Sequence, residues 1–180
     1  MTPMIAGIVV PGGTGHLTTL PDLGWEALRD REAHIETVTW SPPRGILDLD
    51  VDPEPFVRVH VELALRRLPA GAQPVVIAKS FGTYAAALAA EHSLPAIWLT
   101  PLLTRPAVVD GITRNTAPQL LVCGTADEWW DADAARATGK RVLTVENGEH
   151  SLRVPGPLRN YTEVLGVVGT AIEEFLDALD

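Results

Sequence analysis

The feature that most constrains the fold is an apolar run that leads directly into a helix of small residues, at residues 74–87. Residues 75–78 are four consecutive apolar residues, Val-Val-Ile-Ala, a pattern typical of a strand buried on both faces of a sheet. The alanine-rich residues 85–90 predict a helix shortly afterwards. Because Ser80 and Gly82 stand between the two, the chain must turn sharply from strand to helix at the serine.

A serine between two small residues is the pattern of a nucleophile elbow, a turn that holds the serine hydroxyl out on a strained backbone. The flanking positions must be small because the turn brings the end of the strand close to the start of the helix. Gly82 meets this need, and Ala78 replaces the usual first glycine with one extra methyl group. The alternative is that Ser80 simply caps the helix, since serine is a favoured N-cap residue. The rest of the chain has to decide between the two.

Five further apolar runs predict strands, at residues 5–10, 35–40, 96–100, 119–123 and 141–145. Helices are predicted at residues 22–31 with Asp22 as the N-cap, at 55–68, 85–92, 130–138 and 158–179, with a short one between 101 and 118. Strands that alternate with helices predict an α/β fold, a three-layer α/β/α sandwich with a mainly parallel sheet of about six strands. A chain of 180 residues favours a single domain over residues 1–180.

Charge and composition argue against several classes of partner. A net charge of −9 disfavours binding to nucleic acid, which requires a basic surface. No apolar stretch approaches the length needed to span a bilayer, and the first apolar run ends at Pro11 without the basic lead-in of a signal peptide. Cys123 is the only cysteine, so no intrachain disulfide can form. We expect a cytoplasmic protein with no nucleic-acid or membrane partner.

Two polar turns supply the residues that a serine nucleophile needs. A serine hydroxyl attacks only when a base removes its proton, and an acid fixes the tautomer of that base. Asp127 lies four residues after the strand that ends at Cys123, and His150 lies five residues after the strand that ends at Val145. Since ligands bind at the carboxyl ends of parallel strands, we expect Ser80, Asp127 and His150 to meet there.

Each of these residues also has a simpler interpretation. An aspartate after a glycine turn often caps a helix, here the one that Trp129 and Trp130 open, and a loop histidine is usually just solvated. All three residues in the order Ser, Asp, His, each after an appropriate strand, favour a catalytic triad instead. We predict Ser80 as nucleophile, His150 as base and Asp127 as the acid that orients it.

With these residues in view, the sequence resembles the α/β-hydrolase superfamily, as a small member that lacks the first strands and any cap domain. The likeness covers nearly the whole length, and residues 78–82 match the elbow motif of the family. The resemblance implies an oxyanion hole formed by the backbone N–H of Phe81 and by one N–H of the loop after the first strand. We expect Gly13 to supply the latter, with Gly12 and Thr14 as alternatives. The family often has His-Gly in this loop, where this chain has Pro-Gly.

The glycine-rich loop at residues 11–16 also suggests a nucleotide-binding loop, but its context argues against one. Thr18 stands where a dinucleotide motif needs its third glycine, and Pro21 interrupts the expected helix. No lysine follows the glycines, as a phosphate-binding P-loop requires. His16 either lines the pocket or is solvated, and the five histidines show no paired metal-ligand spacing. We therefore expect no cofactor and no metal.

These observations together predict a serine hydrolase that cleaves a small ester or thioester through an acyl-enzyme on Ser80, with a small-molecule acyl substrate. Residues 41–52 and 101–118 are too few to form a cap domain, so we expect an open, shallow site that disfavours long lipids. An amidase or peptidase is an alternative. A second hypothesis is a catalytically silent scaffold that binds a small molecule or a partner protein, and a third is a lyase or cofactor-free oxygenase.

Overall fold

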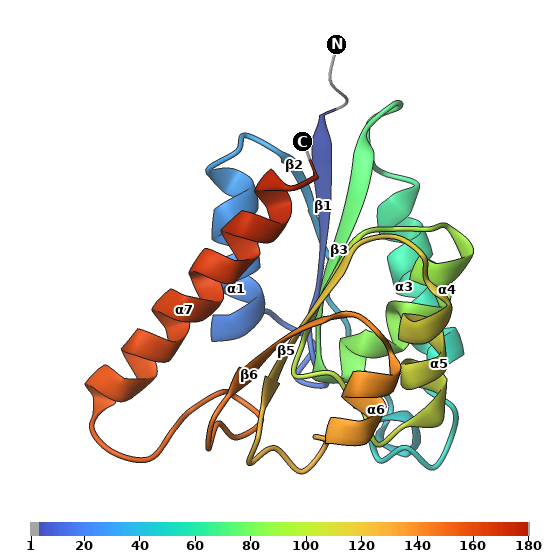
Figure 1. The fold of residues 1–180 in the computed structure, drawn as a ribbon. Coiled ribbons are helices and arrows are strands. Elements are labelled where there is room, and N and C mark those ends of the chain that lie inside the picture. The colour runs from blue at the N-terminus through green and yellow to red at the C-terminus, as the bar shows by residue number, and fades with distance from the viewer. Residues whose placement is uncertain (1–3, 180) are drawn as a thin grey trace.

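The computed structural model describes residues 4–179 and is built on one six-stranded sheet (Figure 1). All neighbouring strands are parallel, in the order β2-β1-β3-β4-β5-β6. The strands are β1 (Ile5–Val10), β2 (His34–Thr37), β3 (Gln73–Lys79), β4 (Ala96–Leu99), β5 (Gln119–Gly124) and β6 (Arg141–Val145). The chain moves outward from β1 to β2 and then crosses back to β3, so the direction of winding reverses between β1 and β3.

Helices cover both faces of the sheet, with α1 and α7 on one side and α3, α4, α5 and α6 on the other (Figure 1). They are α1 (Thr19–Arg29), α2 (Arg44–Leu47), α3 (Glu54–Leu65), the 3₁₀ helix η1 (Ser80–Ala85), α4 (Ala86–Glu91), α5 (Pro106–Arg114), α6 (Ala132–Ala137) and α7 (Leu158–Asp177). The predicted three-layer α/β/α architecture is confirmed. Among the helices of residues 4–179, none is both long enough and apolar enough to cross a membrane.

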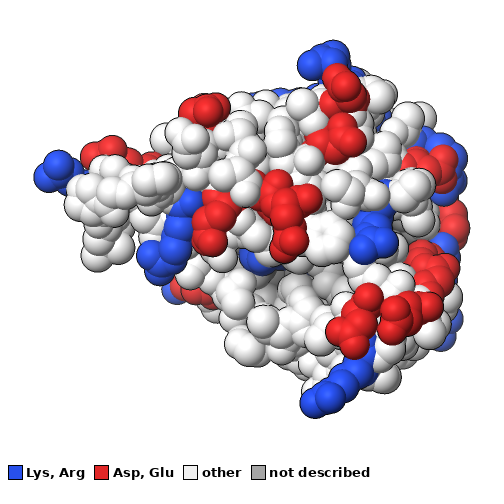
Figure 2. Space-filling model, turned by 90° about the horizontal axis from the view of Figure 1, so that it is seen from below, with Lys and Arg blue, Asp and Glu red and all other residues white. Residues whose placement is uncertain are grey.

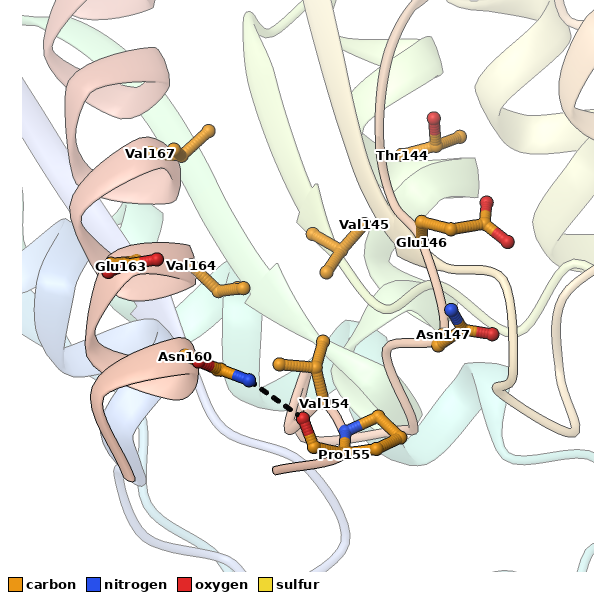
Figure 3. A pocket seen from close by; sticks show the side chains of 10 residues that line it. All are labelled: Thr144, Val145, Glu146, Asn147, Val154, Pro155, Asn160, Glu163, Val164 and Val167. Atoms are coloured by element: carbon orange, nitrogen blue, oxygen red, sulfur yellow. Dashed lines mark hydrogen bonds between the residues drawn. The ribbon is translucent and has the colours of Figure 1, made fainter. Parts of the chain in front are cut away.

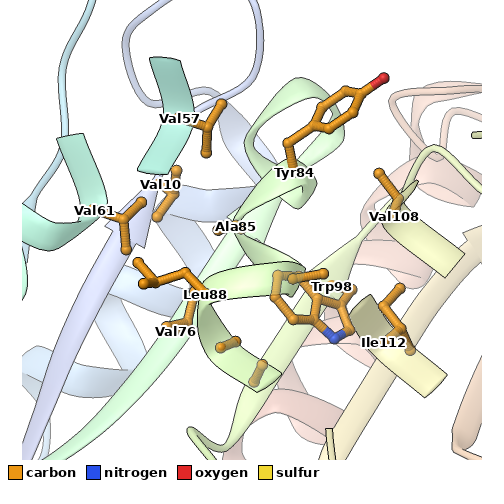
Figure 4. Close-up of a cluster of buried hydrophobic side chains, with 14 of the residues drawn as sticks. Val10, Val57, Val61, Val76, Tyr84, Ala85, Leu88, Trp98, Val108 and Ile112 are labelled. Atoms are coloured by element: carbon orange, nitrogen blue, oxygen red, sulfur yellow. The ribbon is translucent and has the colours of Figure 1, made fainter. Parts of the chain in front are cut away.

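The central strands are apolar without interruption because they are buried on both faces. In β3, Val75 and Ile77 belong to the cluster packed against α1 and α7, while Val76 and Ala78 belong to the opposite cluster. Figure 4 shows this second cluster, in which strand residues meet side chains of α3, α4 and α5. Both clusters hold β3 in place, and the position of Ser80 at its end is therefore fixed from two sides.

A buried polar network ties β4, β5 and α5 together. The Trp98 indole N–H donates to Gln119 Oε1 at 2.8 Å, and Gln119 Nε2 donates to the carbonyl oxygens of Ile112 and Asn115. The Asn115 side chain in turn donates to the carbonyl oxygen of Leu94. Each polar side chain of this network thus finds a partner, as a low-dielectric interior requires.

Some predicted boundaries differ from the structure. The first helix begins at Thr19 and not at Asp22, because Leu20 and Pro21 are buried and extend its packed face by one turn. Proline is tolerated there since the first turn of a helix needs no partner for that N–H. Residues 41–52, where the sequence analysis placed no helix or strand, contain the short helix α2. The second strand ends at Thr37, before the predicted Trp40.

Replacing Trp98 by phenylalanine tests the buried network. Trp98→Phe removes ring volume and leaves Gln119 Oε1 without its donor, so we expect the free energy of unfolding to fall by about 2–3 kcal/mol. Trp25→Phe is the matched control, because Trp25 is only partly buried in α1, and it should change stability by no more than about 0.5 kcal/mol. Urea unfolding followed by circular dichroism measures both, and equal losses would contradict the assigned network.

Candidate active site

The predicted site residues lie at the carboxyl edge of the sheet, where the winding reverses. The loop after β1 and the turn after β3 are neighbours because Val10 pairs with Ala78 across the two strands. A reversal point of this kind opens a crevice at the ends of the strands. Figure 2 looks onto this edge, where acidic side chains with several basic ones among them surround a hollowed and largely uncharged centre.

Ser80 sits on a strained turn of the kind the sequence predicted. Its φ of +51° lies in the left-handed region, which non-glycine residues rarely adopt. The Thr83 hydroxyl donates to the carbonyl oxygen of Ser80 at 2.5 Å and fixes the turn. Gly82 allows it to form, because a Cβ there would lie 2.5 Å from the carbonyl oxygen of Pro11. The sequence analysis missed Thr83, whose hydroxyl three residues after the serine was the available signal.

The structure brings the three predicted side chains into one hydrogen-bonded row. His150 Nε2 lies 2.7 Å from Ser80 Oγ, and His150 Nδ1 lies 2.8 Å from Asp127 Oδ2. A carboxylate accepts only, so Nδ1 carries the proton and Nε2 is left to accept from the serine hydroxyl. The Asp127 side chain is 3% exposed and that of His150 is 29% exposed. The acid is thus shielded while the base remains accessible to a substrate.

Two glycine-containing turns hold Asp127 and His150 together. The N–H groups of Thr125 and Ala126 donate to the carbonyl oxygens of Val145 and Gly148, which links the turn after β5 to the turn after β6. Gly124 is required for this contact, because a Cβ there would lie 2.1 Å from the carbonyl oxygen of Gly148. The sequence showed both glycines but did not show that their turns touch.

Asp127 does not cap a helix. Its Oδ1 accepts the backbone N–H of Trp129 at 3.0 Å, while its Oδ2 faces His150. The N-cap of α6 is Asp131, whose side chain accepts from the N–H of Ala134 at 2.8 Å. The simpler interpretation of Asp127 is therefore wrong, and both of its carboxylate oxygens serve to orient groups at the site.

The loop after β1 places Gly12 nearer to the serine than Gly13. A Cβ on Gly12 would lie 3.9 Å from Ser80 Oγ, whereas one on Gly13 would lie 4.0 Å from Phe81 Cβ and against Leu47. In the described part of the chain, the N–H groups of Gly12 and Gly13 make no hydrogen bond. Both are therefore free to donate to a ligand, as is required of an oxyanion hole.

Trp40 fixes this loop, and the sequence analysis did not identify it. Its indole N–H donates to the carbonyl oxygen of Gly12 at 2.9 Å, and its backbone N–H donates to the carbonyl oxygen of Gly15. Gly15 has a φ of +81°, and a Cβ there would lie 1.9 Å from the Trp40 carbonyl oxygen. The only signal for this role in the sequence was the presence of a tryptophan shortly after the second strand.

The other polar residues near the site have ordinary surroundings. His16 is exposed, and its ring makes a hydrogen bond to the carbonyl oxygen of Thr14. Glu146 and Glu149 are exposed on either side of the turn before His150. Burial lowers the pKa of Lys79, an effect that the negative charges of Asp127 and Glu149 oppose. Among residues 4–179, no group of three His, Cys, Asp or Glu side chains is placed to hold a metal ion.

A separate hollow of about 490 Å³ lies between β6 and α7 (Figure 3). Val145, Val154 and Val164 point into it, and the Asn160 side chain at its rim donates to the carbonyl oxygen of Pro155. Its lining contains no serine, histidine or cysteine. The hydrogen-bonded row of Ser80, His150 and Asp127 is therefore the better candidate for chemistry.

Comparison with known proteins gives a match in structure but not in sequence. No protein-family model matches this chain, and no curated protein sequence does. Est1E from Butyrivibrio proteoclasticus is similar in structure at a TM-score of 0.70 and 18% identity, over 99% of this chain and 89% of that one. A putative hydrolase of the alpha/beta superfamily from Xanthomonas campestris is similar at a TM-score of 0.66 and 18% identity, over 96% of this chain and 98% of that one. The Pyrococcus furiosus esterase Pf2001 is similar at a TM-score of 0.65 and 12% identity, over 98% of this chain and 84% of that one.

The lone thiol provides a test of the site that needs no substrate. Burial raises the pKa of Cys123 to about 12, so at pH 8 only about one thiol in ten thousand is ionised. We expect Ellman's reagent to leave the folded protein unmodified for many minutes and to detect one thiol after unfolding in urea. Rapid reaction of the folded protein would contradict the packing of Cys123 beneath the turn that carries Asp127.

Proposed function

Because the chain has the α/β-hydrolase fold, we propose that it is a serine hydrolase that cleaves small esters or thioesters. The single observation that carries the proposal is the continuous row of hydrogen bonds from Ser80 through His150 to the shielded Asp127. Chance polar neighbours would not place a nucleophile on a strained turn, a base within 2.7 Å of it and an acid on the far nitrogen of that base.

The proposed reaction proceeds through an acyl-enzyme. Ser80 Oγ attacks the carbonyl carbon while His150 Nε2 removes the hydroxyl proton, and the negative charge moves to the former carbonyl oxygen. His150 then gives the proton to the leaving alkoxide or thiolate as its bond to the carbonyl carbon breaks. Water repeats both steps on the acyl-enzyme and releases the acid. Asp127 keeps Nδ1 protonated throughout and stabilises the imidazolium.

The oxyanion is held by backbone N–H groups at the point where β1 and β3 meet. We assign one donor to Phe81, which follows the nucleophile, and the other to Gly12 or Gly13 in the loop that Trp40 fixes. These donors are already oriented before the reaction, so they stabilise the developing charge without reorganisation.

The substrate we propose is a small ester. Activated acyl groups need the least help with the leaving group, and the short segments around the site leave it open to solvent. The structures to which this chain is similar include proteins described as esterases, and Est1E has been seen with ferulic acid bound. These descriptions support an ester in preference to an amide.

Substitution of the proposed triad tests the function. We expect hydrolysis of 4-nitrophenyl acetate, butyrate and octanoate by the unmodified protein, at rates that fall as the acyl chain lengthens. Ser80→Ala and His150→Ala should each lower kcat by about a thousandfold or more, because each removes a group that the others need. Ser93→Ala and His92→Ala are matched controls, since both residues are exposed beyond the end of α4, and they should retain full activity.

A fluorophosphonate probe separates this enzyme from a silent scaffold. The probe bonds covalently to an activated serine with loss of fluoride, so it should label the unmodified protein and Ser93→Ala but not Ser80→Ala. Absence of labelling, together with absence of ester hydrolysis, would overturn the proposed function in favour of a protein that only binds.

Trp40→Phe tests the support of the oxyanion loop. The substitution keeps an aromatic ring in the core but removes the N–H that donates to Gly12, so the loop loses one of its two anchors to Trp40. We expect kcat for 4-nitrophenyl butyrate to fall about tenfold with little change in KM, because the lost alignment acts mainly in the transition state. An unchanged kcat would show that the loop does not need this hydrogen bond.

A further inference from the structure

One arginine on the loop before α5 has no polar partner among residues 4–179. Arg105 ends the loop that follows β4 and directly precedes α5. Its side chain makes no hydrogen bond and no ion pair with any residue that the structure describes, and its Nε is buried without an acceptor. Arg58 on α3, by contrast, is paired with Glu54 and Glu91. A buried guanidinium N–H without an acceptor is uncommon enough to need an explanation.

The position of Arg105 is fixed by stacking and not by polar groups. Its guanidinium carbon lies 5.1 Å from the ring centroid of Trp129. Two hydrogen bonds hold Trp129 in place. The Trp129 backbone N–H donates to Asp127 Oδ1, and the Trp129 carbonyl oxygen accepts the N–H of Leu103. The guanidinium is therefore oriented by the same turn that carries the proposed catalytic acid, and its terminal amino groups stay free to donate.

The loop of Arg105 is also attached to the nucleophile turn. The N–H of Leu102 donates to the Thr83 hydroxyl at 3.4 Å, and that hydroxyl donates to the carbonyl oxygen of Ser80. The N–H of Arg105 donates to the carbonyl oxygen of Leu102. A short chain of hydrogen bonds thus links the backbone at Arg105 to the backbone at Ser80.

Tyr84 of η1 provides a second polar group close to the loop of Arg105, because its neighbour Thr83 is bonded to that loop. Its ring leaves the core cluster with the hydroxyl directed away from the buried side chains (Figure 4), and the hydroxyl makes no hydrogen bond within residues 4–179. Burial raises the pKa of Tyr84, the charge of Arg105 opposes that rise, and the charge of Asp52 adds to it.

We propose that Arg105, together with the Tyr84 hydroxyl, binds a carboxylate carried by the substrate, so that the preferred esters are anionic. The inference rests on the proposed hydrolase function and narrows its substrate class. A guanidinium and a phenol both donate hydrogen bonds, and a carboxylate accepts them with its two oxygens. The acidic residues on this face repel a free anion, so a local cation held over Trp129 serves to select and place one.

Paired substrates that differ only in one carboxylate test the inference. The acyl pair is 4-nitrophenyl hexanoate and the mono-4-nitrophenyl ester of adipate; the leaving-group pair is 4-nitrophenyl butyrate and 3-carboxy-4-nitrophenyl butyrate. We expect Arg105→Gln to lower kcat/KM for the anionic member of at least one pair by about tenfold or more, mainly through KM. The neutral members should change by less than about twofold.

Two further variants control for charge. Arg159→Gln removes the same charge from an exposed position on α7 and should leave the ratio of anionic to neutral kcat/KM unchanged. Asp52→Asn removes a negative charge that acts on Tyr84 and should raise that ratio, because one repulsive charge is lost. If Arg105→Gln has the same ratio as the unmodified protein for both pairs, the inference is wrong.

A binding measurement separates failure of this inference from failure of the hydrolase proposal. Adipate and 5-hydroxy-2-nitrobenzoate are titrated calorimetrically into the unmodified protein and into Arg105→Gln. Binding that Arg105→Gln loses supports the carboxylate site even when no ester is hydrolysed. Equal binding by both proteins, or binding by neither, overturns it while leaving the hydrolase proposal to its own test.

Discussion

The left-handed backbone at Ser80 is the constraint on which the rest of the site depends. A conformation of this kind costs about 1–3 kcal/mol and persists only when its surroundings determine it. Here β3 is held between two apolar clusters, Thr83 hydrogen-bonds the turn from within, and Gly82 lets the helix start lie against the loop after β1. Packing of the helices against the sheet therefore offsets the conformational cost of the left-handed backbone at Ser80.

Close backbone contacts then assemble the remaining groups around that serine. Gly82 allows contact between the loops after β3 and β1, and Gly124 allows contact between the turns after β5 and β6. At both places a side chain as small as a methyl group would meet a carbonyl oxygen at 2.5 Å or less. The precision of the Asp127 and His150 geometry follows from these contacts, because loops that touch through their backbones have little freedom to drift.

The charged side chains differ between the two sides of the site. On the side of His150, exposed glutamates flank the turn, and burial lowers the pKa of Lys79 at the end of β3. On the side of α5, Arg105 lies over Trp129 with free donors, and its charge and that of Asp52 act in opposite directions on the pKa of Tyr84. A fold of this type supports many reactions, so the proposed choice of substrate depends on these few side chains and not on the sheet.

The sequence by itself determined the order of strands and helices, the elbow at Ser80 and the candidates Asp127 and His150, because apolar periodicity and short motifs are local properties of a chain. It failed at Asp22, where burial of Leu20 and Pro21 moved the helix start, and it could not separate Gly12 from Gly13. Only the tertiary structure decided that Trp40 anchors the glycine loop and that Asp127 faces His150 and not a helix end. It also decided that the buried Nε of Arg105 finds no acceptor among residues 4–179. Those facts depend on which residues distant in sequence come within hydrogen-bonding reach, and distances across a sheet are set by packing that no local pattern encodes.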